Sequence, residues 1–147
     1  MDQATESIII KGNVENIYNM WADFENFPQF MKPVKSVRRK GESLSHWEVD
    51  GPFGTTIEWD AITTRMDKNQ RIAWNSTDNG DIKTSGQVTF TKLPADETQV
   101  TVTMKYMPKP GLAISIFDSL FGHLDERLVQ NLRDFKSFAE KEIRRHG

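Results

Sequence analysis

The sequence predicts an α+β fold in which a curved antiparallel β-sheet wraps around one long C-terminal helix. Between Gly111 and His146, apolar residues recur at steps of three and four, which keeps one apolar stripe in register along a helix for roughly eight turns. Most of the preceding chain instead alternates apolar and polar residues, as half-buried strands do. Because so long a stripe needs a wide apolar surface to lie on, we expect the helix to pack against the sheet. The stripe consists of Ile114, Phe117, Leu120, Phe121, Leu124, Leu128, Leu132, Phe135, Phe138, Ala139 and Ile143.

Gly122 interrupts the helical pattern of this C-terminal segment. Glycine in a helix interior costs about 1 kcal/mol relative to alanine. We therefore expect a kink at Gly122, or a short first helix before the main one.

Composition limits the kind of protein that the chain forms. The chain has 147 residues, which predicts one domain over residues 1–147. A net charge of −2, with only short basic clusters, argues against a nucleic-acid-binding module. The absence of cysteine excludes disulfides and thiolate metal sites. No apolar run approaches the roughly 20 residues of a membrane span, so we expect no stable membrane insertion and a cytoplasmic protein.

The N-terminal part predicts one strand followed by two short helices. Glu6–Lys11 is a β-branched run that predicts the first strand. Asn13 is a favourable N-cap for an amphipathic helix that starts at Val14 and ends near Asp23. Four large apolar residues between Phe24 and Met31 fit a second, shorter helical turn.

The central part predicts consecutive strands with one wet face and one dry face, joined by short loops into an antiparallel meander. The dry face is rich in aromatic residues, namely Trp47, Trp59, Trp74, Phe90 and Tyr106. The predicted strands are Val34–Arg39, Leu44–Asp50, Ile57–Thr64, Ile72–Ser76, a long strand that contains Val88 and Phe90, and Val100–Tyr106.

Several short motifs, in this order along the chain, resemble one known family. They are Trp21–Met31 followed by Val34–Val37, then Glu58–Ala61, Arg71–Trp74, Gly86–Phe90, Thr98–Val102 and Leu132–Lys136. Together they resemble the START-related (SRPBCC) helix-grip superfamily, and within it the polyketide cyclase/dehydrase-like branch. The resemblance covers nearly the whole chain. It implies a curved seven-stranded antiparallel sheet that grips the C-terminal helix, two short helices after the first strand, and an apolar cavity between sheet and helix. The family contains aromatase/cyclases, lipid and sterol carriers and quinone-binding proteins, so the resemblance implies no single ligand or reaction.

No catalytic or metal-binding constellation stands out in the sequence. His46 alternates away from Trp47 and should face solvent, His123 points away from the apolar stripe, and His146 is terminal. None has a partner at the spacing of a known metal motif, so we expect no metal and no cofactor, and dispensable histidines. The carboxylate pairs Glu58 and Asp60, and Asp125 and Glu126, are expected to be solvated.

A few polar residues should reach the interior. Their ordinary role would be to satisfy one another or a buried water. Their alternative role would be to fix a carbonyl or hydroxyl group of a ligand in a mostly apolar pocket, and the sequence favours neither role. These residues are Tyr106, Thr63, Ser76, Thr84 and Asn131.

The bulky apolar surface on both layers predicts a protein that binds a hydrophobic small molecule, such as a lipid, a quinone or a polyketide-like aromatic, as carrier or binding protein. An alternative is an aromatase/cyclase or dehydratase that acts on a polyketide-like substrate in the same cavity, with Tyr106 or a neighbouring polar group as acid or base. A third possibility is an interaction module with a vestigial cavity. The sequence leaves the oligomeric state open. The predicted ligand-binding residues are Phe27, Phe30, Met31, Trp47, Trp59, Trp74, Phe90, Met104, Tyr106, Phe117, Phe121, Leu124 and Leu128.

Overall fold

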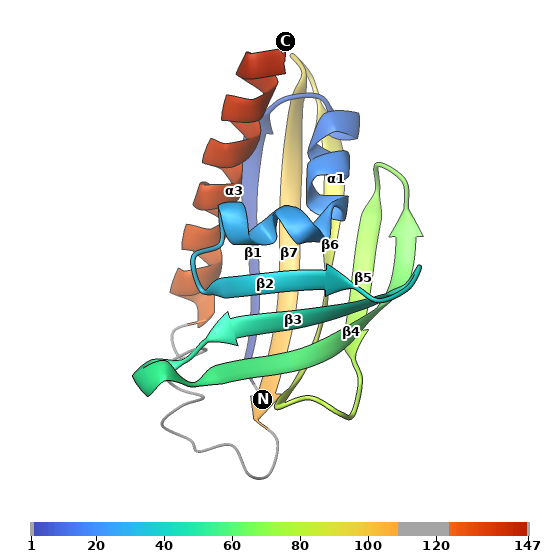
Figure 1. Ribbon diagram of the computed structural model, residues 1–147. Coiled ribbons are helices and arrows are strands. Elements are labelled where there is room, and N and C mark those ends of the chain that lie inside the picture. Colours follow the sequence, from blue (N-terminus) through green and yellow to red (C-terminus); the bar gives the residue numbers. More distant parts are fainter. Residues whose placement is uncertain (1, 109–123, 147) are drawn as a thin grey trace.

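The computed structural model describes residues 2–108 and 124–146, and it describes the side chains of all of these except residues 2, 52, 108, 124 and 146. Seven strands, two α-helices and two short 3₁₀ segments make up this part of the chain (Figure 1). In chain order they are β1 (Asp2–Lys11), α1 (Val14–Ala22), η1 (Phe24–Gln29), β2 (Val34–Arg39), β3 (Leu44–Asp50), η2 (Pro52–Gly54), β4 (Thr56–Asp67), β5 (Arg71–Ser76), β6 (Ile82–Leu93), β7 (Glu97–Pro108) and α3 (Leu124–His146).

The strands form one antiparallel sheet in the order β1-β7-β6-β5-β4-β3-β2. Strands β2 to β7 follow one another as a meander, and β1 closes the row beside β7. The sheet is strongly curled, so that β2, β3 and β4 run across the direction of β1, β7 and β6 (Figure 1). Helix α3 lies along β1, α1 lies over β6 and β7, and η1 lies beside β2 (Figure 1). The predicted helix-grip fold is confirmed.

Local sequence explains the two short helices. The side chain of Asn13 accepts a hydrogen bond from the backbone N–H of Asn16 at 2.8 Å, which confirms the predicted N-cap of α1. The segment after α1 is a 3₁₀ helix rather than an α-helical turn, and it contains Pro28. Proline lacks the N–H that an α-helix interior uses, so the chain cannot continue α1 through this segment.

The two ends of the chain differ from the predicted boundaries. Strand β1 begins at Asp2 and not at Glu6, because it pairs with β7 along its whole length. Helix α3 is described from Leu124, so the predicted helical segment before it, and the kink expected at Gly122, lie outside the described residues. Within residues 2–108 and 124–146, no helix combines the length and the apolar character that crossing a membrane requires.

Helix α3 meets α1 and η1 around one fully buried aromatic ring. Phe135 has no exposed surface, and its ring lies 4.9 Å from that of Trp21 and 5.2 Å from that of Phe30. Leu128, Leu132 and Ala139, at helical spacing around Phe135, are buried in the same cluster. The predicted apolar stripe therefore forms the centre of the core in the part of the helix that the structure describes.

Replacing Phe135 with alanine should destabilise the protein by about 3–5 kcal/mol, because the fully buried ring leaves a cavity between three packed elements. Urea unfolding would measure this change. Lys141→Ala, on the exposed side of the same helix, is the control and should change the free energy of unfolding by less than about 0.5 kcal/mol. Equal effects of the two substitutions would contradict this account of the core.

Candidate functional site

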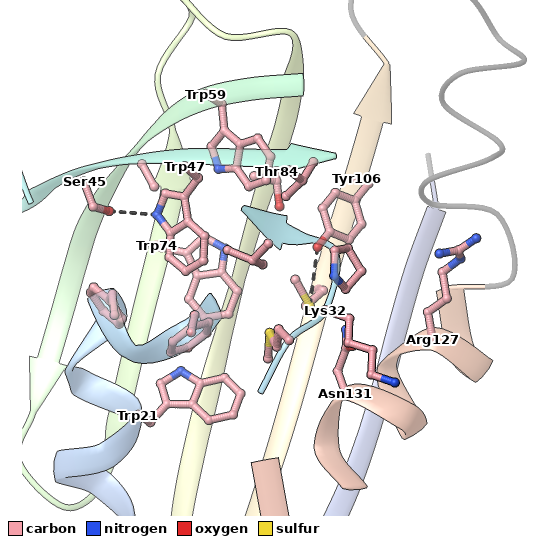
Figure 2. A pocket seen from close by; sticks show the side chains of 18 of the residues that line it. Trp21, Lys32, Ser45, Trp47, Trp59, Trp74, Thr84, Tyr106, Arg127 and Asn131 are labelled. Atoms are coloured by element: carbon pink, nitrogen blue, oxygen red, sulfur yellow. Dashed lines mark hydrogen bonds between the residues drawn. The ribbon is translucent and has the colours of Figure 1, made fainter. Parts of the chain in front are cut away.

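A cavity of about 350 Å³ lies between the concave face of the sheet, α1 and η1, and the N-terminal half of α3 (Figure 2). We call it the sheet–helix cavity. Most of its wall is apolar, and all four tryptophans of the chain contribute to it. The apolar lining residues are Trp21, Phe24, Phe27, Met31, Pro33, Val34, Trp47, Val49, Trp59, Ala61, Trp74 and Met104.

Two stacked indole rings form one wall of the cavity. Trp47 on β3 and Trp59 on β4 are cross-strand partners, and their rings lie 6.2 Å apart with an angle of 6° between the planes. Cross-strand aromatic pairs of this kind stabilise a sheet. The indole N–H of Trp47 donates a hydrogen bond to the hydroxyl of Ser45 at 2.9 Å (Figure 2). This bond fixes the ring, so the indole N–H needs no hydrogen bond to a bound molecule.

A third indole lies beside this pair because its neighbour on β6 has no side chain. Trp74 on β5 pairs with Gly86. A Cβ atom at Gly86 would lie 2.8 Å from Cζ2 of Trp74 and would also collide with the backbone oxygen of Thr103. Glycine at this position thus lets the Trp74 ring lie against the sheet at the edge of the cavity.

Tyr106 and Thr84 form a polar group within this apolar wall. The phenol of Tyr106 donates a hydrogen bond to Sδ of Met104 at 3.7 Å (Figure 2). Burial raises the pKa of Tyr106 far above its ordinary value, and the facing hydroxyl of Thr84 opposes this only in part. Thr84 is 5% exposed, and apart from the phenol of Tyr106 its Oγ1 has no hydrogen-bond partner among the described residues. Such an atom can accept or donate a hydrogen bond to a molecule in the cavity.

Charged and amide side chains gather on the α3 side of the cavity. Arg127 and Asn131 extend from α3, and Lys32 lies in the segment between η1 and β2 (Figure 2). The amide of Gln130 donates a hydrogen bond to the carboxylate of Asp134 at 2.9 Å. The cavity is therefore apolar near the tryptophans and polar near α3.

Seven of the thirteen predicted ligand-binding residues line the cavity, namely Phe27, Met31, Trp47, Trp59, Trp74, Met104 and Tyr106. Phe117 and Phe121 lie outside the described residues, and the side chain of Leu124 is not described either. The remaining three, Phe30, Phe90 and Leu128, lie in the packed core instead of the cavity wall. The ring of Phe30 packs on Phe138 at 5.0 Å, and that of Phe90 packs on Tyr18 at 5.3 Å, so neighbouring helices cover both.

Most of the polar residues that were expected in the interior also line the cavity. Thr63, Thr84, Tyr106 and Asn131 line the cavity, whereas Ser76 accepts a hydrogen bond from the backbone N–H of Thr84 at 3.0 Å and lies outside the lining.

Sequence reasoning missed several lining residues. Arg127, Gln130 and Asp134 recur at helical spacing with Asn131 beside the apolar stripe, which is the signal that could have placed them. The missed residues are Trp21, Phe24, Lys32, Pro33, Val34, Ser45, Val49, Ala61, Arg127, Gln130 and Asp134.

The prediction that His46 is simply exposed is wrong. Its side chain is only 16% exposed, and its Nδ1 lies 2.6 Å from a carboxylate oxygen of Asp60 on the convex face of the sheet. This hydrogen bond, more than the nearby Lys40, holds the pKa of Asp60 below its ordinary value. The expectation that Asp60 is merely solvated is therefore also wrong. His123 lies outside the described residues, and the side chain of His146 is not described.

The architecture is the helix-grip fold that START-like proteins have. A solved structure of a START superfamily protein from Mycobacterium smegmatis superposes with a TM-score of 0.70 at 18% identity, covering 99% of each chain. The aromatase/cyclase ZhuI of Streptomyces sp. R1128 superposes with a TM-score of 0.80 at 16% identity, covering 99% of this chain and 98% of that one. At these identities the likeness shows the fold.

Sequence comparison gives the family. Residues 10–133 match the family described as "Polyketide cyclase / dehydrase and lipid transport", and the chain belongs to that family. A 17.2 kDa protein encoded in the melC2-rnhH intergenic region of Streptomyces lincolnensis is 34% identical over 141 residues, covering 96% of this chain and 91% of the relative. The resemblance seen in the short motifs is confirmed.

Both tyrosines of the chain should resist ionisation in the folded protein. Burial raises the pKa of Tyr106 and, together with the negative charge of Asp67, that of Tyr18. In the unfolded chain both phenols ionise near pH 10. The stability that comes from their raised pKa in the folded protein is therefore complete below pH 10, and it is lost as the pH rises through the folded-state pKa of each tyrosine.

We expect phenolate absorbance at 295 nm to appear only as the protein unfolds above about pH 10. The free energy of unfolding should fall less steeply with alkaline pH in Tyr106→Phe than in the natural sequence. Two phenolates that form near pH 10 in a fully folded protein would contradict the buried position of Tyr106.

Proposed function

We propose that the protein binds a hydrophobic small molecule, such as a lipid, a quinone or a polyketide-like aromatic, in the sheet–helix cavity and acts as its carrier or binding protein. The observation that carries this proposal is the cavity of about 350 Å³ with all four tryptophans in its wall. Ligand sites are typically concave and mostly apolar, with a few polar groups that orient the bound molecule.

The size of the cavity supports an occupant. The apolar side chains of its wall, the indole rings among them, lack packing partners on the cavity side. A bound apolar molecule would restore van der Waals contact with this wall and remove its apolar surface from water.

The polar groups indicate how the ligand is oriented. An apolar or aromatic body would lie against the wall formed by the indole rings of Trp47, Trp59 and Trp74. A carbonyl or hydroxyl group of the ligand would then reach the hydroxyls of Thr84 and Tyr106, which lie in the same wall (Figure 2). A buried hydroxyl that gains a partner in this way favours ligands with such a group over plain hydrocarbons.

The second candidate is a cyclase or dehydratase that acts on a polyketide-like substrate. The observation that favours it is the phenol of Tyr106 in the cavity wall. Its raised pKa keeps the phenol protonated, so it can donate a hydrogen bond to a substrate carbonyl but is poorly suited to give up or take up a proton. Among the described lining residues there is no histidine, and the one carboxylate, Asp134, is hydrogen-bonded to Gln130. Binding without chemistry therefore has the stronger support.

A larger side chain at Ala61 should abolish ligand binding without unfolding the protein. Ala61 lies in the cavity wall on β4, and a phenylalanine there would occupy the space of the ligand. The test is titration with palmitate, a short-chain ubiquinone and anthraquinone, followed by tryptophan fluorescence and by the melting temperature. The natural sequence should show a saturable fluorescence change and a higher melting temperature with at least one of these probes.

Ile62→Phe is the matched control, because the neighbouring side chain points to the convex face and is 42% exposed. This variant should bind as the natural sequence does. Loss of binding in Ala61→Phe alone supports a ligand cavity. The proposal fails if no probe binds, or if Ala61→Phe binds normally. A loss of about 1–3 kcal/mol of stability in Ala61→Phe would instead indicate an overpacked, already filled core.

A further inference from the structure

We propose that the convex face of the sheet carries a site for a divalent transition-metal ion, with His46, Glu48 and Glu58 as its ligands. The three side chains each offer one ligand atom, and these atoms lie within 4.8 Å of one another. The site is on the opposite side of the sheet from the sheet–helix cavity and does not depend on ligand binding there.

Strand pairing brings these residues together. His46 on β3 pairs with Asp60 on β4, and Glu48 pairs with Glu58 two residues further along the hairpin. Side chains on a strand alternate between faces, and Trp47 and Trp59 between them point into the cavity. All four polar side chains therefore share the convex face, as two neighbouring rows.

The hydrogen bond to Asp60 determines which nitrogen of His46 is available. The ionised carboxylate of Asp60 can only accept, so the proton of this 2.6 Å hydrogen bond belongs to Nδ1 of His46. Nε2 then faces the two glutamates. A metal-bound histidine commonly donates its other N–H to a carboxylate in this way, and the carboxylate fixes the ring orientation.

The distances from Nε2 to the two glutamates are too long for direct hydrogen bonds, but they leave room for a metal ion between the three atoms. Nε2 of His46 lies 3.7 Å from Oε1 of Glu48 and 3.7 Å from Oε1 of Glu58. Both distances exceed the 2.7–3.2 Å of a direct N–H···O hydrogen bond. Ligand atoms bound tetrahedrally at about 2.1 Å are separated by about 3.4 Å, which is within a few tenths of an ångström of both distances from Nε2, and the two glutamate oxygens lie within 4.8 Å of each other.

The surrounding groups orient the ligands and balance the charge. The hydroxyl of Ser36 donates a hydrogen bond to Oε2 of Glu48 at 2.9 Å, which leaves Oε1 toward His46. Lys40 lies 3.4 Å from the second oxygen of Asp60. Arg38, which is exposed, pairs with His46 across β2 and β3. Three carboxylates against these two cations leave a formal charge of −1 with a neutral imidazole, which favours a cation.

The ligand set indicates the class of metal. Imidazole nitrogen favours zinc, copper, nickel and iron, whereas magnesium and calcium prefer all-oxygen sites. Glu58 has 52% of its side chain exposed, so water can complete the coordination of an ion held by three protein ligands. Zn²⁺ is therefore the appropriate probe.

The test is calorimetric titration of the chelator-treated, full-length protein with ZnCl₂, with the melting temperature as a second readout. We expect one Zn²⁺ per chain and a higher melting temperature in the natural sequence. His46→Gln and Glu58→Gln should each weaken binding at least about tenfold. Glu42→Gln, the same charge change at an exposed loop position, should bind as the natural sequence does. X-ray absorption of the zinc complex should show one imidazole nitrogen together with oxygen ligands at about 2.0–2.2 Å.

Three results would overturn the proposal. The first is no binding of Zn²⁺ at 100-fold molar excess. The second is binding that His46→Gln retains, or that Mg²⁺ reproduces with equal effect, because it would show only a negatively charged surface. The third is a zinc spectrum without imidazole nitrogen. Ala61→Phe, which fills the cavity, should bind Zn²⁺ normally, so failure of the ligand proposal and failure of the metal proposal remain distinguishable.

Discussion

The structure depends on the contact by which α3 joins the two short helices that help to cover the concave, aromatic face of the sheet. Phe135 of α3 is the centre of this contact, because it touches Trp21 of α1 and Phe30 after η1 with no exposed surface. Helix α3, α1 and η1 are thus fixed relative to one another through one ring. These three elements leave part of the sheet uncovered on the side of β3, β4 and β5. The sheet–helix cavity lies over this uncovered part, so its extent depends on where α3, α1 and η1 end.

Regular patterns in the sequence predicted the fold and much of the cavity wall. Period-two alternation is a local property of a strand, and it correctly placed Trp47, Trp59 and Tyr106 on the concave face. The same alternation could not separate them from Phe90, because that distinction depends on where α1 crosses the sheet, which is a tertiary property. The surroundings of His46 were missed for a related reason, since its partners lie on the next strand and are found only once the register of the β3–β4 hairpin is known.

The two faces of the sheet differ in electrostatics as well as in polarity. On the concave side, burial keeps Tyr106 protonated, and the charged lining residues lie toward α3 and the segment before β2. On the convex side, ionised groups are concentrated, and the hydrogen bond from His46 favours the ionised form of Asp60. A sheet one residue thick thus separates a low-dielectric compartment from a charged surface, and alternation along β3 and β4 is enough to produce both.

The buried residues fall into two groups, and this division bears on how such a protein changes over time. The larger group surrounds Phe135, whereas the smaller one contains Trp59, Ala61 and Tyr106 in the wall of the cavity. Substitutions in the smaller group alter the shape of a space that already lacks full packing, and they leave the contacts around Phe135 intact. Descendants of one ancestral chain can therefore diverge in the molecules they accept while inheriting the same scaffold. Such tolerance would suit a family whose description joins cyclases, dehydrases and lipid transport.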